Sequence, residues 1–344
     1  MSAGQKAMQF GLIGLGAISR AHLDGYRQAS GAARVAAVCD LDEARAQRVA
    51  AEIGARPYTD YRALLCNADI EAVDIALPHN LHYPVGRAAL EAGKHVLIEK
   101  PLAPSVHECD GLIALARQHG LLLSVSENAR FAKAYVEVEK LLRKGALGTP
   151  RLVRTLIYGS ELTALTDKAH WRARASAALG GAIVDSSPHS FYLLKWLFGE
   201  TASLRAFTAT LIPDCEVEDN ALVTGRFKSG ALFTSQFTFT AEIPWGERLE
   251  VYGSEGTVIV DQLGNPPARR FRDKSDMTGT PLEGVPFDPA GWKAASIAAS
   301  VAGFAAAVAQ KAPAPIDPLD ARYVMRVIET CYESVRAGGR LIEL

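Results

Sequence analysis

The chain has 344 residues, more than one hydrophobic core usually fills, so two domains are expected. Hydrophobic residues make up 49% of the chain, charged residues 22%, and the formal net charge is −1. This is an ordinary globular composition. Because no basic run is present to meet phosphates, a nucleic acid is not expected as the main partner.

The chain starts "MSAGQKAMQF", without an apolar segment of the signal-peptide type, and has no uninterrupted 18-residue apolar run. Neither a secretory signal nor a membrane span is therefore expected. The five cysteines are scattered, with no C-x-x-C pair and no Cys/His cluster: Cys39, Cys66, Cys109, Cys215 and Cys331. They are interpreted as small buried hydrophobic residues in a reducing compartment. This predicts a cytoplasmic protein with no metal site and no disulfide.

Residues 1–126 alternate between short apolar runs and helical patterns. The runs lie at 8–14, 34–40, 72–78, 95–101 and 121–127, and the helical patterns at 17–28, 41–54, 83–94 and 105–120. Within the runs, apolar residues do not alternate with polar ones, so the strands are expected to be buried on both faces. Strands separated by helices predict an α/β domain with a doubly wound, parallel Rossmann sheet.

Residues 127–344 are expected to form a second domain, of the α+β class. Longer runs of alternating polarity at 151–160, 203–212, 221–241 and 247–261 predict an open, mostly antiparallel sheet. Ser229-Gly230 and residues 253–256 are hairpin signals. Residues 262–289 are rich in Pro, Gly and charge and are expected to form a surface loop or arm. Helices are expected at about 292–310 and 318–336, and the last helix and strand are candidates to pack back on the first domain.

The segment "FGLIGLGAIS" joins the first predicted strand to the first predicted helix and contains Gly14-x-Gly16-x-x-Ser19. Gly14 would permit a tight turn, Gly16 would let the backbone approach a pyrophosphate, and position 19 must be small for packing. Ala17 and Ile18 open the helix, whose free N–H groups would face the phosphates. Taken alone, the glycines could also be a plain strand–helix turn.

Asp40 ends the second predicted strand, 21 residues past Ser19. A carboxylate there can accept hydrogen bonds from both ribose hydroxyls and would repel a 2′-phosphate. The next residue is Leu41, not an arginine. The motif therefore predicts NAD as the cofactor in preference to NADP.

Residues 180–199, "GGAIVDSSPHSFYLLKWLFG", are interpreted as two glycines, a short strand-like piece and a helix. Asp185 and His189 lie where the strand would become the helix. In one interpretation Ser187 and Pro188 are the N-cap and first helical position, and the two polar residues only complete the helix start. In the other, Asp185 and His189 face a cleft and move a proton.

Several motifs together resemble the Gfo/Idh/MocA family, named for glucose–fructose oxidoreductase and inositol dehydrogenase. They are Glu99-Lys100-Pro101 after "AGKHV", the G-G-x-x-x-D-x-x-x-H pattern from residue 180, "HWR" at 170–172, "ENARF" at 127–131, "LEVYGSEGTVIV" and the ending "DARYVMRVIETCYESVRAGGRLIEL". The resemblance runs from about residue 8 to 344. It implies a nicotinamide-dependent oxidoreductase whose open sheets pair into a homodimer or homotetramer.

The resemblance also implies roles for individual residues. Lys100, Asp185 and His189 match the family's catalytic Lys, Asp and His, and Pro101 is expected to follow a cis or strained peptide. The loop along the nicotinamide ribose matches Leu77, Pro78, His79, Asn80 and His82, with Glu99 beside the same ribose. Tyr192 is a departure, because many relatives carry Asp or Asn three residues past the His. It removes a common polar contact to the substrate.

The residue types fit the oxidation of a secondary alcohol, which gives a hydride to nicotinamide C4 only if its hydroxyl proton also leaves. An imidazole is an efficient base near neutral pH, so His189 is assigned as general acid/base. Lys100 would hold the hydroxyl and stabilise the developing alkoxide, and Asp185 would bind the substrate and tune the pKa of its neighbours. The opposite assignment, with Lys100 as the base, stays open. Lys100 taken alone could also be a surface lysine.

Further candidates to bind substrate are Arg130, Tyr158, Trp171 and Arg172, although Trp and Tyr are as often core residues. Lys168, His170, Arg172 and Arg174 form a cationic run. This run is interpreted either as a solvated face or as a positive rim for an anionic or carboxylated substrate.

These features predict an NAD-dependent dehydrogenase for a polyhydroxylated small molecule, namely a sugar, a sugar acid or a cyclitol. The alternative is a glycoside hydrolase or lyase that uses tightly bound NAD transiently, by oxidation, elimination and reduction. A third hypothesis is a redox-sensing binding protein that has lost turnover. Product formation without net NADH would separate the second hypothesis from the first.

Overall fold

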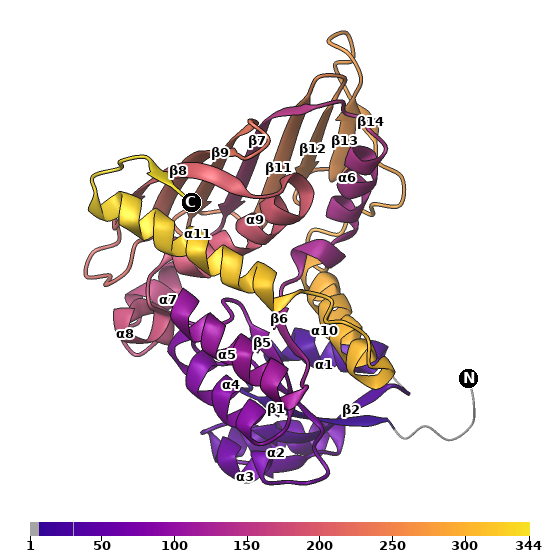
Figure 1. Cartoon of the computed structure of the whole chain (residues 1–344), viewed down its shortest axis with the longest axis vertical. Coiled ribbons are helices and arrows are strands. Elements are labelled where there is room, and N and C mark those ends of the chain that lie inside the picture. The colour runs from indigo at the N-terminus through magenta and orange to yellow at the C-terminus, as the bar shows by residue number, and fades with distance from the viewer. Residues whose placement is uncertain (1–6, 30) are drawn as a thin grey trace. The chain divides into compact units, whose positions relative to one another are not determined.

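In the computed structural model of the chain, residues 7–29 and 31–344 are described, and the chain divides into two compact units. The first unit extends to Asn128 and also includes Ala294–Met325. The second consists of Ala129–Lys293 and Arg326–Leu344. Each unit is built around its own sheet (Figure 1).

The first unit contains a six-stranded parallel sheet with strand order β3-β2-β1-β4-β5-β6, which confirms the predicted Rossmann arrangement. Its strands are β1 (Met8–Ile13), β2 (Ala33–Cys39), β3 (Arg56–Tyr58), β4 (Ala72–Ile75), β5 (His95–Glu99) and β6 (Leu123–Ser126). All residues of β4 and β6 are buried, as expected for strands covered on both faces. The edge strand β3 has only three residues, too few for an apolar run, and was missed by the sequence analysis.

The helices of this unit connect its strands in chain order. They are α1 (Ser19–Gln28), α2 (Glu43–Ile53), α3 (Tyr61–Leu65), α4 (His82–Glu91) and α5 (Val106–His119), with a short 3₁₀ turn η1 (His79–Leu81). The side chains of Asp42 and Ser105 accept hydrogen bonds from the first turns of α2 and α5. Both helices end at left-handed glycines, Gly54 and Gly120.

Helix α10 (Trp292–Gln310) contributes to the core of the first unit. Val301 and Phe304 belong to the same buried cluster as Phe10 and Tyr26, and a Cβ on Gly25 of α1 would lie 2.6 Å from the Val301 Cβ. Among the residues that the structure describes, α10 is also the one helix long and apolar enough to span a membrane. Its most apolar 18-residue stretch has a mean hydropathy of 1.4, and half of that stretch is buried. The core helix of a globular unit has the same composition, and this packing accounts for it.

The second unit contains a nine-stranded sheet with the order β14-β13-β12-β11-β7-β10-β9-β8-β15. The strands are β7 (Pro150–Tyr158), β8 (Thr201–Ala209), β9 (Asn220–Phe227), β10 (Leu232–Thr238), β11 (Gly246–Gly253), β12 (Thr257–Asp261), β13 (Ala268–Phe271), β14 (Thr280–Pro281) and β15 (Ile342–Glu343). Neighbouring strands are antiparallel except β7 and β10, which are parallel. The mostly antiparallel sheet and both predicted hairpins are confirmed.

The helices of the second unit precede or pack on this sheet. They are η2 (Ala129–Phe131), α6 (Lys133–Arg143), α7 (Leu162–Thr166), η3 (Trp171–Ala173), α8 (Ala175–Ala178), α9 (Ala182–Phe198) and the last part of α11 (Pro318–Arg336). Helix α9 lies across β7, β9 and β10 (Figure 1). Phe191 of α9 contacts Phe237 of β10 edge-on, with ring centroids 6.2 Å apart. The residues paired beside Phe237, such as Ile157, therefore face α9, and alternate residues face away from it.

Three predictions about local structure were wrong. Residues 182–184 begin helix α9 instead of forming a strand-like piece. The segment 262–289 carries strands β13 and β14, and it is part of the sheet because β13 pairs with β12 and β14 pairs with β13. Among the cysteines, Cys66 is exposed and Cys215 only half-buried, although Cys39, Cys109 and Cys331 are buried.

Candidate active site

The glycine loop after β1 has the geometry that the sequence predicted. Gly14 has φ of +95°, and a Cβ there would lie 2.2 Å from the carbonyl oxygen of Ala76, so only glycine fits. A Cβ on Gly16 would meet no atom within 4 Å, so the protein itself does not require glycine there. Space left open at Gly16 suits the close approach of a ligand. Ser19 donates its hydroxyl to the carbonyl of Gly16 at 2.7 Å, which fixes the loop against the start of α1.

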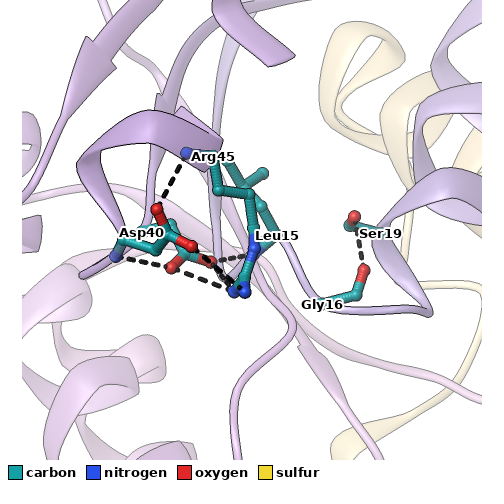
Figure 2. A network of polar contacts seen from close by, with 6 residues as sticks. Leu15, Gly16, Ser19, Asp40 and Arg45 are labelled. Atoms are coloured by element: carbon teal, nitrogen blue, oxygen red, sulfur yellow. Dashed lines mark hydrogen bonds and ion pairs between the residues drawn. The ribbon is translucent and has the colours of Figure 1, made fainter. Parts of the chain in front are cut away.

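Asp40 ties this loop to the turn that follows β2 (Figure 2). Its Oδ2 accepts from the backbone N–H of Leu15 at 2.9 Å and its Oδ1 from that of Asp42 at 2.9 Å. The Nη1 of Arg45 lies 3.3 Å from both carboxylate oxygens. No arginine directly follows Asp40, but the first turn of α2 brings one to it, which the sequence analysis missed.

A cavity of about 380 Å³ lies beside the glycine loop, between α1 and α2. It is lined by Leu15, Gly16, Ala17, Ser19, Arg20, Leu23, Arg45, Arg48, Val49 and Glu52. Among the residues described, no side chain caps the N-terminus of α1, and its first turn carries no acidic residue. Its N–H groups and positive dipole end are therefore suited to an anion.

His82 joins the backbones that follow β4 and β5. Its Nδ1 lies 2.6 Å from the carbonyl oxygen of Pro101 and its Nε2 lies 2.8 Å from that of Leu77. Burial, helped by the nearby His79, lowers the pKa of His82 to about 4. Its imidazole thus braces the two loops. The Lys100–Pro101 peptide is cis, as the resemblance implied.

The loops after β4 and β5 carry the other residues predicted to contact the cofactor. Leu77 lies against Gly14, since a Cβ on that glycine would be 3.0 Å from its side chain. The Oδ1 of Asn80 is buried and has no hydrogen-bond partner among the described atoms. An unpartnered buried acceptor fits a ligand hydroxyl or amide at this place. With the open space at Gly16 and the uncapped start of α1, these residues fit a dinucleotide.

A buried histidine connects β4 to β5. His22 of α1 lies between two carboxylates, with Nδ1 2.8 Å from Oδ2 of Asp74 and Nε2 3.0 Å from Oε1 of Glu99. Asp74 lies near the carboxyl end of β4. Glu99 is the last residue of β5 and immediately precedes Lys100. Glu99 was predicted from the sequence as a cofactor contact, but its connection to Asp74 through His22 was not predicted.

In the second unit, helix α9 is positioned by the two glycines that precede it. A Cβ on Gly181 would lie 1.8 Å from the carbonyl oxygen of Glu218, so this close approach requires glycine. The Glu218 carboxylate accepts from the N–H of Ile183 at 3.1 Å and from the hydroxyl of Tyr332 at 2.7 Å. Glu218, 35 residues from Ile183 in the sequence, therefore accepts a hydrogen bond from the first turn of α9.

Asp185 and His189 are buried on one face of α9, within the helix and not at its cap. This excludes the interpretation in which Ser187 and Pro188 start the helix. The Nε of Arg172 donates to Oδ2 of Asp185 at 2.9 Å, and the guanidinium carbon of Arg172 lies 4.6 Å from the ring centre of Trp171. The structure thus brings Asp185, Arg172 and Trp171 together and fixes the carboxylate by an ion pair.

The remaining substrate candidates divide into two groups. The guanidinium of Arg130 lies 5.9 Å from the ring of Trp196 on α9, so Arg130 is close to this helix. Tyr158 faces away from α9, because Ile157 faces it, and the Tyr158 hydroxyl lies 3.4 Å from Oδ1 of Asp261. The structure therefore separates Tyr158 from Asp185 and His189.

In the cationic run 168–174, the side chains have different surroundings. Lys168 is exposed, with Nζ 3.9 Å from Oδ2 of the equally exposed Asp214. Arg174 is also exposed. Arg172 is two-thirds buried and paired. His170 stacks on Trp171, and burial followed by the charge of Arg172 lowers its pKa. The solvated-face interpretation fits Lys168 and Arg174, and only Arg172 has the surroundings of a binding residue.

Two family models match the chain. Residues 8–127 match the oxidoreductase family with an NAD-binding Rossmann fold, and residues 135–259 match the GFO/IDH/MocA C-terminal domain. Within the described residues, no group of three or more His, Cys, Asp or Glu side chains could hold a metal ion.

Relatives and solved structures agree with these models. Inositol 2-dehydrogenase 4 of Saccharopolyspora erythraea is 32% identical over 74% of each chain. Myo-inositol 2-dehydrogenase of Thermotoga maritima is 27% identical over 74% of this chain and 76% of its own. The structure of a levoglucosan dehydrogenase in complex with NADH and levoglucosan has the same fold, with a TM-score of 0.88 and 22% identity over 98% of this chain and 99% of its own. The chain therefore belongs to the Gfo/Idh/MocA family of NAD-dependent oxidoreductases.

Proposed function

We propose that the protein is a dehydrogenase that oxidises a secondary alcohol of a sugar, a sugar acid or a cyclitol with NAD. One observation carries the proposal: Asp185 and His189 are buried together on one face of α9 and do not cap it. A buried carboxylate and imidazole at helical spacing suit proton transfer and substrate binding better than a structural role at a helix end. The dehydrogenase names of the inositol relatives support the same substrate class.

NAD, when bound, supplies the hydride acceptor at nicotinamide C4. The glycine loop would hold its pyrophosphate at the start of α1, and Asp40 would accept from the ribose hydroxyls. The negative charge of Asp40 favours NAD over NADP, although Arg45 offsets part of that charge. Asn80, through its buried Oδ1, would bind the nicotinamide half.

His189 is proposed as the general acid/base that takes the proton from the reacting hydroxyl. Lys100 would orient this hydroxyl and stabilise the alkoxide as the hydride leaves. Asp185 would accept from a substrate hydroxyl, held in place by Arg172. The reverse assignment, in which Lys100 takes the proton, predicts the same products.

The experiment is to follow NADH formation from a panel of sugars, sugar acids and cyclitols, with NAD and NADP compared. Lys100→Ala and His189→Ala are each expected to lower kcat/KM at least ~100-fold. The exposed residues Lys144 and His119 provide matched controls, and Lys144→Ala and His119→Ala should leave turnover unchanged. Full activity in both site variants would refute the proposal. A product formed without net NADH would instead indicate the hydrolase or lyase that uses NAD transiently.

A homo-oligomer is also proposed, formed through the face of the nine-stranded sheet that points away from α9. Phe207 and Leu222 pair across β8 and β9 and are 50% and 55% exposed, and Leu232 of β10 is 48% exposed. Apolar side chains at this exposure are typical of an interface. Light scattering of the purified protein should give a dimer or tetramer, and a monomer mass would contradict this.

A further inference from the structure

The Asp74–His22–Glu99 array, defined by the three side chains that connect α1, β4 and β5, has a feature that cofactor binding alone does not require. Both ring nitrogens of His22 face carboxylate oxygens, at 2.8 Å and 3.0 Å. A neutral imidazole can donate from only one nitrogen. Hydrogen bonds from the ring to both carboxylates therefore need the imidazolium form.

The surroundings of His22 agree with this protonation. The ring is fully buried, which by itself lowers the pKa, but the charges and hydrogen bonds of Asp74 and Glu99 outweigh burial and raise it to about 10. The hydroxyl of Tyr26 adds a third donor, 3.2 Å from the same Asp74 oxygen, and brings no charge. One imidazolium and two carboxylates leave the array with one net negative charge.

This charge is buried and directed toward one edge of the sheet. The side chains of His22 and Asp74 are completely buried, whereas that of Glu99 is 13% exposed. Glu99 lies at the carboxyl end of β5, an interior strand of the parallel sheet, and ligands bind at this edge of such sheets. The other oxygen of Asp74, Oδ1, has no hydrogen-bond partner among the atoms described, so no donor there spreads its charge. A buried charge is screened far less than a surface charge.

We propose that the Asp74–His22–Glu99 array sets the preference of the enzyme between the two redox forms of its cofactor. The inference rests on the proposed function, in which the nicotinamide half binds beside Glu99. The nicotinamide ring of NAD⁺ carries a positive charge that NADH lacks. A fixed net negative charge beside it stabilises the NAD⁺ complex relative to the NADH complex. The array therefore favours binding of NAD⁺ and release of NADH, which suits an enzyme that works in the direction of alcohol oxidation.

The test measures the dissociation constants of NAD⁺, NADH and ADP-ribose by calorimetry on the full chain. The ratio Kd(NADH)/Kd(NAD⁺) isolates the ring charge, because contacts common to both forms cancel. Asp74→Asn and Glu99→Gln each remove one negative charge, from the buried end and the exposed end of the array. Both are expected to lower this ratio about fivefold, a size typical of one charge at an intermediate effective dielectric constant. Tyr26→Phe removes a hydrogen bond to Asp74 without changing charge and should leave the ratio unchanged.

ADP-ribose binding and the melting temperature report on folding and on the adenosine half of the site. If Asp74→Asn does not fold, Glu99→Gln still tests the charge from the more exposed end. An unchanged ratio in a folded charge variant, or an equal shift in Tyr26→Phe, would overturn the inference while leaving the dehydrogenase proposal intact. Absence of binding of either nicotinamide form to the wild-type protein would instead refute the proposed function.

Discussion

The candidate site residues of the two units are held in place by different means. In the Rossmann unit, backbone groups and small residues form most of the cofactor site: the turn at Gly14, the open space at Gly16 and the uncapped start of α1. In the second unit, side chains from distant segments form it, as when Arg172 reaches Asp185 on α9. A site made of backbone is specified by a local motif, whereas a site made of side chains depends on tertiary packing.

The largest effect is expected from substitutions of the two glycines in the cofactor loop, which should affect different properties of the protein. Gly14→Ala forces a positive φ on a residue with a Cβ and a contact of 2.2 Å with a backbone oxygen, so unfolding should become easier by about 3 kcal/mol or more. Gly16→Ala meets no protein atom within 4 Å, so stability should hold while NAD affinity falls at least ~tenfold. Urea unfolding and NAD titration measure both. Equal loss of stability in the two variants would show that Gly16, too, serves the fold.

The sequence was sufficient where structure is local. The strand–glycine–helix pattern around Gly14 and the position of Asp40 both follow from neighbours in the chain, and so does the helix of residues 318–336. It was insufficient where a distant residue decides. Residues 182–184 were predicted as a strand because they are apolar. The helix starts there because Glu218, distant in the sequence, accepts from the N–H of Ala182 with its backbone carbonyl and from the N–H of Ile183 with its carboxylate. The contact of Arg45 with Asp40 depends on the direction in which α2 follows the turn after β2, and no sequence motif predicts it.

The next largest effect is expected in the second unit, where side-chain contacts hold the candidate site residues. Arg172→Ala removes the ion pair of Asp185, whose side chain is 11% exposed, and should lower kcat/KM roughly 30-fold. NAD affinity should not change, because the variant alters only the second unit. The matched control is the exposed Arg174→Ala, expected to retain full activity. A comparable loss of NAD affinity would argue against the division of roles between the two units.

A third effect concerns pH and the buried charges of the first unit. The pKa of His22 is raised to about 10 by Asp74 and Glu99, with Tyr26 also bonded to Asp74. In the unfolded chain it is near 6.5, so the stabilisation is complete below pH ~6.5 and is lost as pH rises toward ~10. In that window the free energy of unfolding should fall by up to about 1.4 kcal/mol per pH unit. In His22→Gln this decrease with pH should be absent. Urea unfolding of both proteins at pH 7, 8 and 9 measures it, and the same pH dependence of the free energy of unfolding in the two proteins would contradict the assignment.

The smallest effect is expected at the contact between Asp40 and Arg45. Arg45 has a side chain 39% exposed and lies 3.3 Å from Asp40, so water screens much of their interaction. Arg45→Ala should weaken NADP binding about threefold, because Asp40 then repels the 2′-phosphate with its charge less offset. NAD binding should stay nearly constant. Calorimetry with both cofactors measures these affinities. Stronger NADP binding in the variant would show that Arg45 does not offset the repulsion between Asp40 and the 2′-phosphate.

We propose that this chain moves a hydride directly from an alcohol carbon to NAD and that Lys100, Asp185 and His189 carry the reaction. The most direct measurement incubates the enzyme and NAD with a cyclitol deuterated at its ring carbons and determines by mass spectrometry where the deuterium goes. We expect one deuterium in each NADH formed, and loss of this transfer in Lys100→Ala and His189→Ala. Deuterium found in water and not in the cofactor, or unchanged transfer in both variants, would contradict it.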